Sequence, residues 1–258
     1  MSEAQHIRSS VDAAGIATIT IARPDKRNAL TPAMLDALLA SIQTHAANAS
    51  PNTTTRAILL TGEGDLFCAG FDLSLCRDDD TVLPALLSGL SACIAALRNA
   101  PCPVIISAHG AAIAGGCALL GGGDIVLTTD DAKIGYPVVK LGISPAVSAP
   151  TLANACGHGP ARARLLDTQL ISGREAARLG LASESLPSRD ACETRAREIA
   201  THLATKPPHA LAATKSWLNT ITPEANESTL RTALNTSLAL VGQAEEKQLL
   251  PQAWTPKR

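Results

Sequence analysis

The first 145 residues alternate between two hydrophobic patterns, one with the period of a strand and one with the period of a helix. Short runs rich in β-branched residues predict strands at residues 15–22, 56–61, 104–108, 124–128 and 133–136. Apolar residues three or four positions apart predict helices between them, at 31–48, 84–99 and 115–122. The helix at 31 also has a capping threonine followed by proline at its first position. This alternation predicts an α/β core with crossover connections.

The pattern after Pro145 is almost entirely helical. The predicted helices cover residues 146–155, 160–168, 173–179, 189–204, 207–220 and 223–240. A lysine followed by two prolines at 206–208 suggests a boundary, so we expect a core domain of residues 1–205 and a helical region of residues 206–258. Within the core, residues 73–84 carry three consecutive aspartates and are expected to form a mobile surface loop.

Composition excludes several classes of function. Hydrophobic residues make up 46% of the 258 residues and charged residues 17%, which is typical of a globular protein and not of a disordered one. Aromatic residues are 2% and the net charge is −1, which argues against a nucleic-acid partner. The seven cysteines include no CxxC pair, which indicates reduced thiols. The N-terminus is polar and has no signal-peptide core, and no apolar stretch is suited to span a membrane. We therefore expect a cytoplasmic protein without a membrane partner.

Two glycine-rich turns carry the candidate chemistry. The first is residues 62–73 (GEGDLFCAGFDL) and the second is residues 109–117 (HGAAIAGGC), and each directly follows a predicted strand. Turns of this kind can leave backbone N–H groups unpaired, and two such donors facing each other make an oxyanion hole. The alternative is that the glycines only permit tight turns. A dinucleotide fingerprint is unlikely because its third glycine is absent, and the histidine spacing predicts no metal site.

The two turns together resemble the crotonase superfamily, the enoyl-CoA hydratase/isomerase family. The pattern GxGxxFCAGxDL is followed by a proline-flanked strand and then by GxxxxGG. The upstream segment RPDKRNAL at 23–30 is similar to the family's coenzyme A segment, and later landmarks include Pro137, LG at 141–142 and ISG at 171–173. The resemblance implies a spiral of ββα units, followed by a helical C-terminal region. It also implies a homotrimer or a dimer of trimers, and a place in fatty acid metabolism.

The resemblance also implies roles for individual residues. The oxyanion-hole donors would be the N–H groups of Phe71 and Gly115. No permanently bound cofactor is implied, because coenzyme A arrives as part of an acyl-CoA thioester substrate.

A coenzyme A site is implied at five further residues. Lys26 would lie near the phosphates with Arg27 beside it, and the backbone around Ala29 would meet the adenine. Ala69 and Asp72 flank the first donor, and Asp72 is expected to hold that donor in place by accepting hydrogen bonds from turn amides. A solvated polar loop is the alternative for the two cations.

The chain departs from the family where protons are transferred. Family hydratases use two glutamates, and this sequence has Ala118 and Val138 at those positions; a further acidic position of some relatives falls near Ala146. Tyr136 lies two residues before Val138, which places it on the same face of an extended segment, so it is our candidate substitute. Its alternative is a core aromatic residue. Other candidates are Cys117 as a low-pKa thiol, Lys140, Ser144, Ser148, the aspartates at 78–80, and Glu245 or Glu246.

These observations favour an acyl-CoA-processing enzyme that stabilises a thioester enolate, with very weak hydration of crotonyl-CoA. Thioester hydrolysis or decarboxylation is a second possibility, because the oxyanion hole does most of the work in both. A non-catalytic acyl-CoA binding protein is a third.

Overall fold

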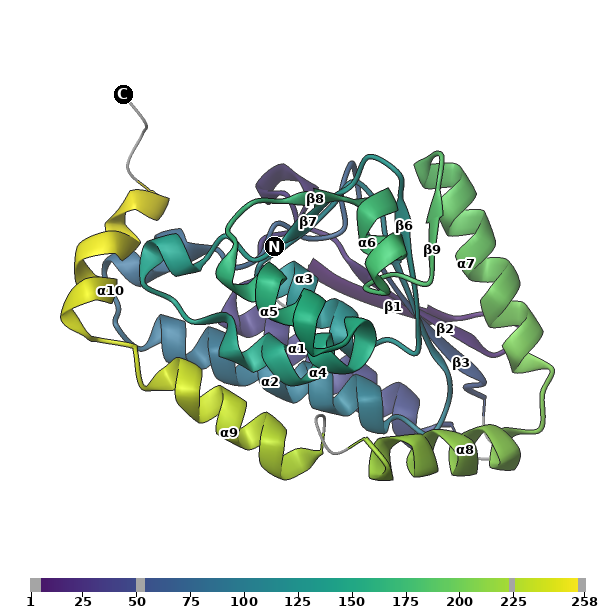
Figure 1. Ribbon diagram of the computed structural model, residues 1–258. Coiled ribbons are helices and arrows are strands. Elements are labelled where there is room, and N and C mark those ends of the chain that lie inside the picture. Colours follow the sequence, from purple (N-terminus) through teal and green to yellow (C-terminus); the bar gives the residue numbers. More distant parts are fainter. Residues whose placement is uncertain (1–5, 50–53, 223–225, 255–258) are drawn as a thin grey trace.

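The computed structural model describes residues 6–49, 54–222 and 226–254, and its core is a six-stranded sheet (Figure 1). The strand order is β1-β2-β3-β4-β6-β9, in which only β1 and β2 are antiparallel. The strands are β1 (Ile7–Val11), β2 (Ile16–Ile21), β3 (Ala57–Gly62), β4 (Val104–Ala108), β6 (Ile125–Thr129) and β9 (Glu184–Leu186). A smaller sheet, β5-β7-β8, is formed by β5 (Ala111–Ile113), β7 (Lys133–Gly135) and β8 (Ile171–Ser172).

Helices cover both faces of the large sheet, because alternate residues of each strand point to opposite sides. Ile58 and Leu60 of β3 belong to the main core, which includes α1 (Pro32–Ala47) and α2 (Val82–Asn99). Leu59 of the same strand belongs to a second cluster under α7 (Arg189–Ala204). In length and apolarity α2 would suffice to cross a membrane, but seven of its side chains are buried in the core, which accounts for its composition.

The remaining helices lie outside the large sheet, and α3 (Gly115–Leu119) among them is buried in the middle of the molecule (Figure 1). The others are α4 (Ala149–Cys156), α5 (His158–Leu166), α6 (Gly173–Leu179), α8 (Pro208–Thr220), α9 (Glu227–Leu238) and α10 (Ala244–Leu249). α9 packs against α2 and against the 3-10 turn Pro145–Ser148. Lys215 of α8 is buried, and its Nζ donates to Asp124 Oδ2 at 2.7 Å and to the carbonyls of Leu97 and Cys102 at 3.1 Å. The C-terminal helices are thus bound to the core of their own chain.

The α/β class and the helical C-terminal region predicted from the sequence are confirmed. The helices at 173–179 and 189–204 have the predicted bounds, and α1 begins as predicted, with Thr31 Oγ1 accepting from Met34 N at 3.2 Å. The strands missed by the sequence are β1, β5, β8 and β9. These are short, and β1 is largely exposed, so their hydrophobic pattern is weak.

Two predicted segments need correction. The segment at 73–84 is not all loop: Leu73–Arg77 forms a 3-10 helix and α2 begins at Val82. The predicted helix at 146–155 divides into a 3-10 turn and α4, since Pro150 sits in the first turn of α4. The predicted helix at 223–240 includes residues 223–225, which lie outside the described residues; α9 begins at Glu227, with Asn226 as its cap.

Candidate active site

The two glycine turns lie against each other and are joined by backbone hydrogen bonds. Cys68 N donates to Ala111 O at 3.0 Å, and Ile113 N donates back to Cys68 O at 3.0 Å. Gly70 has a φ of +99°, and a Cβ built on it would lie 2.9 Å from Ile113 O and 3.5 Å from Gly115 N. Glycine at position 70 is therefore required by both backbone conformation and space, and it brings the first turn up to the start of α3.

The N–H groups of Phe71 and Gly115 are left without an acceptor. The two neighbours of Phe71 both bond to Leu30: the Gly70 carbonyl accepts from Leu30 N at 2.8 Å, and Asp72 N donates to Leu30 O at 2.9 Å. The N–H of Phe71 takes no part in these bonds. Gly115 is the first residue of α3, where a helix has no internal acceptor for its N–H. Across residues 6–49, 54–222 and 226–254, neither N–H donates a hydrogen bond. Two free donors on adjoining turns are what an oxyanion hole requires.

The residue before Gly115 has a strained backbone. Ala114 has φ +52° and ψ −113°, a conformation that residues with a Cβ rarely adopt. Its N–H donates to Gly135 O at 2.8 Å, which ties the turn to β7. Strain of this kind persists only where the surrounding structure enforces it, and it is concentrated at functional sites.

A buried asparagine holds the first turn from behind. Asn28 is fully buried at φ +54°, and its Nδ2 donates to the carbonyls of Glu63 and Leu66 at 2.8 Å and of Phe67 at 3.1 Å. Its Oδ1 accepts from Arg23 N at 2.9 Å. The sequence reasoning assigned no role to Asn28; the available signal was an asparagine, which tolerates positive φ, in a polar segment.

The residues expected to bind coenzyme A lie along the edge of this turn. The side chains of Lys26 and Arg27 are exposed, and among the described residues neither makes an ion pair. The Arg27 carbonyl accepts from Ala69 N at 3.0 Å, and the Ala29 carbonyl accepts from Arg23 Nη1 at 3.0 Å. The loop with its two free cations is thereby joined to the turn that carries Phe71.

The hydrogen-bond donors to Asp72 differ from the turn amides expected from the sequence. Its carboxylate accepts mainly from side chains, from Arg23 Nη1 at 2.8 Å and from Ser74 Oγ at 2.5 Å. Burial opposes the charge on Asp72, but the Ser74 hydroxyl and the Arg23 guanidinium outweigh burial and lower the pKa of the carboxyl group. Asp72 is therefore an ionised anchor for Arg23, which in turn contacts the backbone at Ala29.

The free N–H groups border a cavity of about 160 Å³, called here the front cavity. Ala69, Phe71 and Gly115 line its donor side, and Ala118 and Val138 line it as well. The rest of its wall is mainly apolar and includes Leu87, Leu90, Ile113, Leu141, Ile143 and Val147. Its polar lining residues are Tyr136, Lys140, Ser144 and Ser148, and none of its lining residues is an aspartate or a glutamate. The front cavity thus brings two residues with free N–H groups together with an apolar wall, and its described lining offers no carboxylate for proton transfer.

Tyr136 and Ser148 are buried polar residues of this wall. Only 3% of Tyr136 is exposed, and its hydroxyl has the Cys117 thiol and the Ser148 hydroxyl as hydrogen-bonding partners. Burial raises the pKa of the Tyr136 phenol well above its ordinary value, so the hydroxyl stays neutral and does not serve as a base. The suggested low-pKa thiol is wrong: burial raises the pKa of Cys117 to about 12.

The other candidates from the sequence lie elsewhere. Glu246 is buried, but its carboxylate accepts from Gly242 N at 3.0 Å, and Glu245 is exposed; neither lines the front cavity. Asp79 accepts from Thr81 N at 2.8 Å on the surface. His109 Nε2 lies 2.9 Å from Gly64 O, and burial lowers the pKa of this imidazole, consistent with a structural role. In the part of the chain that the structure describes, no His, Cys, Asp and Glu residues gather into a metal site.

Comparison with known proteins agrees with this geometry. A model of the enoyl-CoA hydratase/isomerase family matches residues 12–255. A probable enoyl-CoA hydratase of Rhodobacter capsulatus is 34% identical over 203 residues, which are 78% of this chain and 76% of that protein. The 1,2-epoxyphenylacetyl-CoA isomerase of Escherichia coli is 31% identical over 228 residues, covering 86% of this chain and 83% of that protein.

Solved structures give the same result for the fold. An enoyl-CoA hydratase/isomerase from Xanthobacter autotrophicus Py2 has a TM-score of 0.85 and 26% identity, and the match covers 96% of this chain and 92% of that one. The two free backbone donors and the α/β core agree with a family match over nearly the whole length of the chain. The chain belongs to the enoyl-CoA hydratase/isomerase family.

Proposed function

We propose that this protein binds acyl-CoA thioesters and stabilises their enolates through the N–H groups of Phe71 and Gly115. The observation that carries the proposal is the pair of unpaired donors on adjoining turns at the wall of a mainly apolar cavity. A thioester oxygen between the donors would accept two hydrogen bonds in a site with little water, where such bonds are strongest. Lys26 and Arg27 are exposed cations on the same edge and would meet the phosphates of coenzyme A.

We propose further that hydration of an enoyl double bond is very slow in this protein. Hydration needs one group to remove a proton from water and another to protonate the α-carbon. Ala118 and Val138 can do neither, and Tyr136 is held in its neutral form, so it does not serve as a base. The loss of one acid or base typically costs about 10²–10⁴-fold in rate.

Among the alternatives, decarboxylation of a malonyl-type thioester fits the front cavity better than hydrolysis. Its C–C bond breaks to release CO₂, and the electron pair moves onto the thioester oxygen, so no base is needed; the enolate then takes one proton from water at its α-carbon. Lys140 is the one charged residue that lines the front cavity and would meet the carboxylate. Hydrolysis would need an activated nucleophile, whereas the Cys117 thiol is protonated and Ser144 Oγ caps Ala146 N at 3.2 Å.

Calorimetric titration and three assays test these proposals on the intact protein. Butyryl-CoA should bind more tightly than free coenzyme A, because only the thioester reaches the two donors. Crotonyl-CoA should be hydrated at a rate far below that of a competent hydratase, and CO₂ release from malonyl-CoA and methylmalonyl-CoA should be faster than thioester hydrolysis. Equal affinity for coenzyme A and butyryl-CoA would contradict the enolate proposal. Tight binding with no turnover of any substrate would favour a binding protein instead.

We also propose a homotrimer or a dimer of trimers, with residues 206–258 as the region that assembles the trimer. The support is an exposed apolar face on α8, where Trp217 is 63% exposed and Leu218 and Ile221 are more than half exposed. Light scattering on the eluted protein should give three or six times the mass of 26.6 kDa, and a monomer would contradict this.

A further inference from the structure

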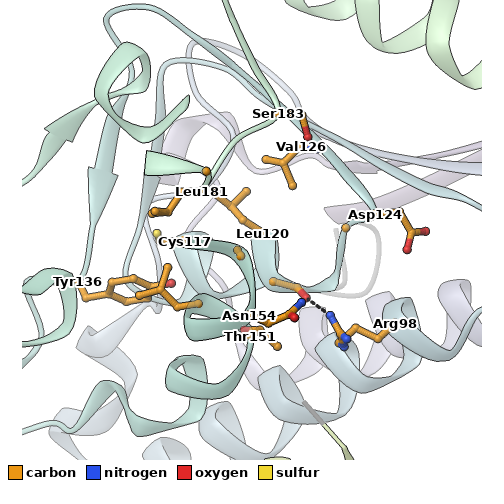
Figure 2. Close-up of a pocket in the computed structure, with 15 residues that line it drawn as sticks. Arg98, Cys117, Leu120, Asp124, Val126, Tyr136, Thr151, Asn154, Leu181 and Ser183 are labelled. Carbon is orange, nitrogen blue, oxygen red and sulfur yellow. Dashed lines mark hydrogen bonds between the residues drawn. The ribbon is translucent and has the colours of Figure 1, made fainter. Parts of the chain in front are cut away.

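A second cavity lies behind the front cavity, with Tyr136 in the wall of both. It has a volume of about 180 Å³ and is called here the back cavity (Figure 2). Tyr136 and Cys117 stand at one end of it, and Arg98 stands at the other. Among the residues that the structure describes, Tyr136 alone lines both cavities. Helix α3 borders both cavities, because Ala118 lines the front cavity and Cys117 lines the back cavity.

The Tyr136 ring is a fixed wall between the cavities. It is 3% exposed and is packed within the main hydrophobic core, with Cys117 and Ser148 near its hydroxyl. A ring packed in a core does not swing aside freely.

The volume of the front cavity limits what can enter it. An apolar cavity of about 150 Å³ holds a molecule the size of benzene. The front cavity, at about 160 Å³, therefore has room for an acyl group of about four to six carbons. A longer chain that continued past Ala118 would meet the Tyr136 ring.

The back cavity could accept more of an acyl chain if the ring were absent. Leu120, Val126, Leu152 and Leu181 give it apolar walls. Its far end is polar: Arg98 Nη2 donates to Asn219 Oδ1 at 3.1 Å, and Asp124 and Ser183 also line it. Added length is thus limited to the methylenes that reach from Tyr136 to this polar end.

We propose that Tyr136 sets the length of the acyl group and restricts the protein to short-chain acyl-CoA thioesters. This rests on the proposed function, because it presumes that the acyl group occupies the front cavity. Tyr136 then determines specificity by its ring, a role separate from any proton transfer by its hydroxyl.

Binding of saturated acyl-CoA thioesters from two to twelve carbons tests the proposal, since calorimetry with unreactive ligands does not depend on turnover. In the unmodified protein, affinity should rise by about four-fold per methylene up to four to six carbons and then stop rising. Tyr136→Ala should move that maximum to longer chains by at least three carbons. Tyr136→Phe, which keeps the ring and loses the hydroxyl, should leave the maximum where it was.

A second variant guards against a folding defect. Tyr136→Leu keeps an apolar side chain and should shift the maximum in the same direction by a smaller amount. An unchanged maximum in folded Tyr136→Ala or folded Tyr136→Leu protein would overturn the proposal. Affinity that still rises at ten carbons in the unmodified protein would overturn it too. Failure of every acyl-CoA to bind better than coenzyme A would instead overturn the proposed function.

Discussion

The two sides of the front cavity are built in different ways. The donor side consists of backbone: the N–H groups of Phe71 and Gly115, held by ladder hydrogen bonds, by Asn28 and by the strained Ala114. The opposite side consists of single side chains, and there Ala118 and Val138 supply only apolar surface. The first side has both candidate donors, whereas the second has no carboxylate among its described lining residues.

The difference shows which part of a site depends on fold and which on individual residues. A backbone donor is positioned by glycines and by the chain around it, so it remains as long as the turn folds. A general acid or base is one side chain, and a single substitution removes it. Anion stabilisation and proton transfer can therefore be separated in this fold.

The largest effect should come from supplying the carboxylates that the front cavity lacks. Ala118→Glu combined with Val138→Glu places two carboxylates beside the donors and should raise the rate of crotonyl-CoA hydration by about 10²–10⁴-fold. Spectrophotometric loss of the enoyl double bond measures the rate. The matched Ala118→Gln and Val138→Gln variant should stay at the unmodified rate, and an equal gain in it would show that proton transfer is not the cause.

The next largest effect should come from damage to the donor side. Gly70→Ala forces a Cβ to within 2.9 Å of Ile113 O at a φ of +99°, which displaces the Phe71 N–H. Loss of one such donor should lower turnover by about 10²–10³-fold, measured on the most active substrate of the panel. Gly159→Ala is the control, because a Cβ there meets nothing within 4 Å. Full activity in a folded Gly70→Ala protein would contradict the assignment of Phe71.

Removal of the buried support should be seen in stability. Asn28→Ala leaves the buried carbonyl of Phe67 and the partly buried carbonyls of Glu63 and Leu66 without their donor, and it puts a Cβ-bearing residue with no side-chain hydrogen bonds at φ +54°. We expect the free energy of unfolding in urea to fall by about 2–4 kcal/mol. Asn235→Ala, on the exposed face of α9, should change it by less than about 0.5 kcal/mol. Equal effects of the two substitutions would show that Asn28 does not hold the turn.

The smallest effect, with the opposite sign, should come from relief of strain. Ala114→Gly removes the Cβ from a conformation at φ +52° and should raise the free energy of unfolding by about 0.5–2 kcal/mol. Ala213→Gly, in the middle of α8, should instead lower it by about 1 kcal/mol. Destabilisation by Ala114→Gly would mean that the backbone at Ala114 is not strained.

The sequence predicted the regular parts of the fold because their hydrophobic periods are long and strong. The four inner strands of the large sheet, β2, β3, β4 and β6, and helices such as α7 were found from such patterns. The edge strands β1 and β9 were missed, and β8 has only two residues and no period to detect. The sequence also identified the two turns and the absent carboxylates, since both are local features. It could not show Asn28 as a support or the cavity behind Tyr136. Both depend on contacts between segments far apart in the chain, such as Asn28 with Phe67.

The most direct test of the central claim measures polarisation of a bound thioester carbonyl. When 2,4-hexadienoyl-CoA binds, the two N–H groups should draw charge onto its carbonyl oxygen and shift its ultraviolet absorption to longer wavelength. The unmodified protein should give this shift together with the very weak hydration proposed above, and Gly70→Ala should reduce the shift at saturating ligand. Saturation of the site, verified by calorimetry, without any shift would contradict the oxyanion hole.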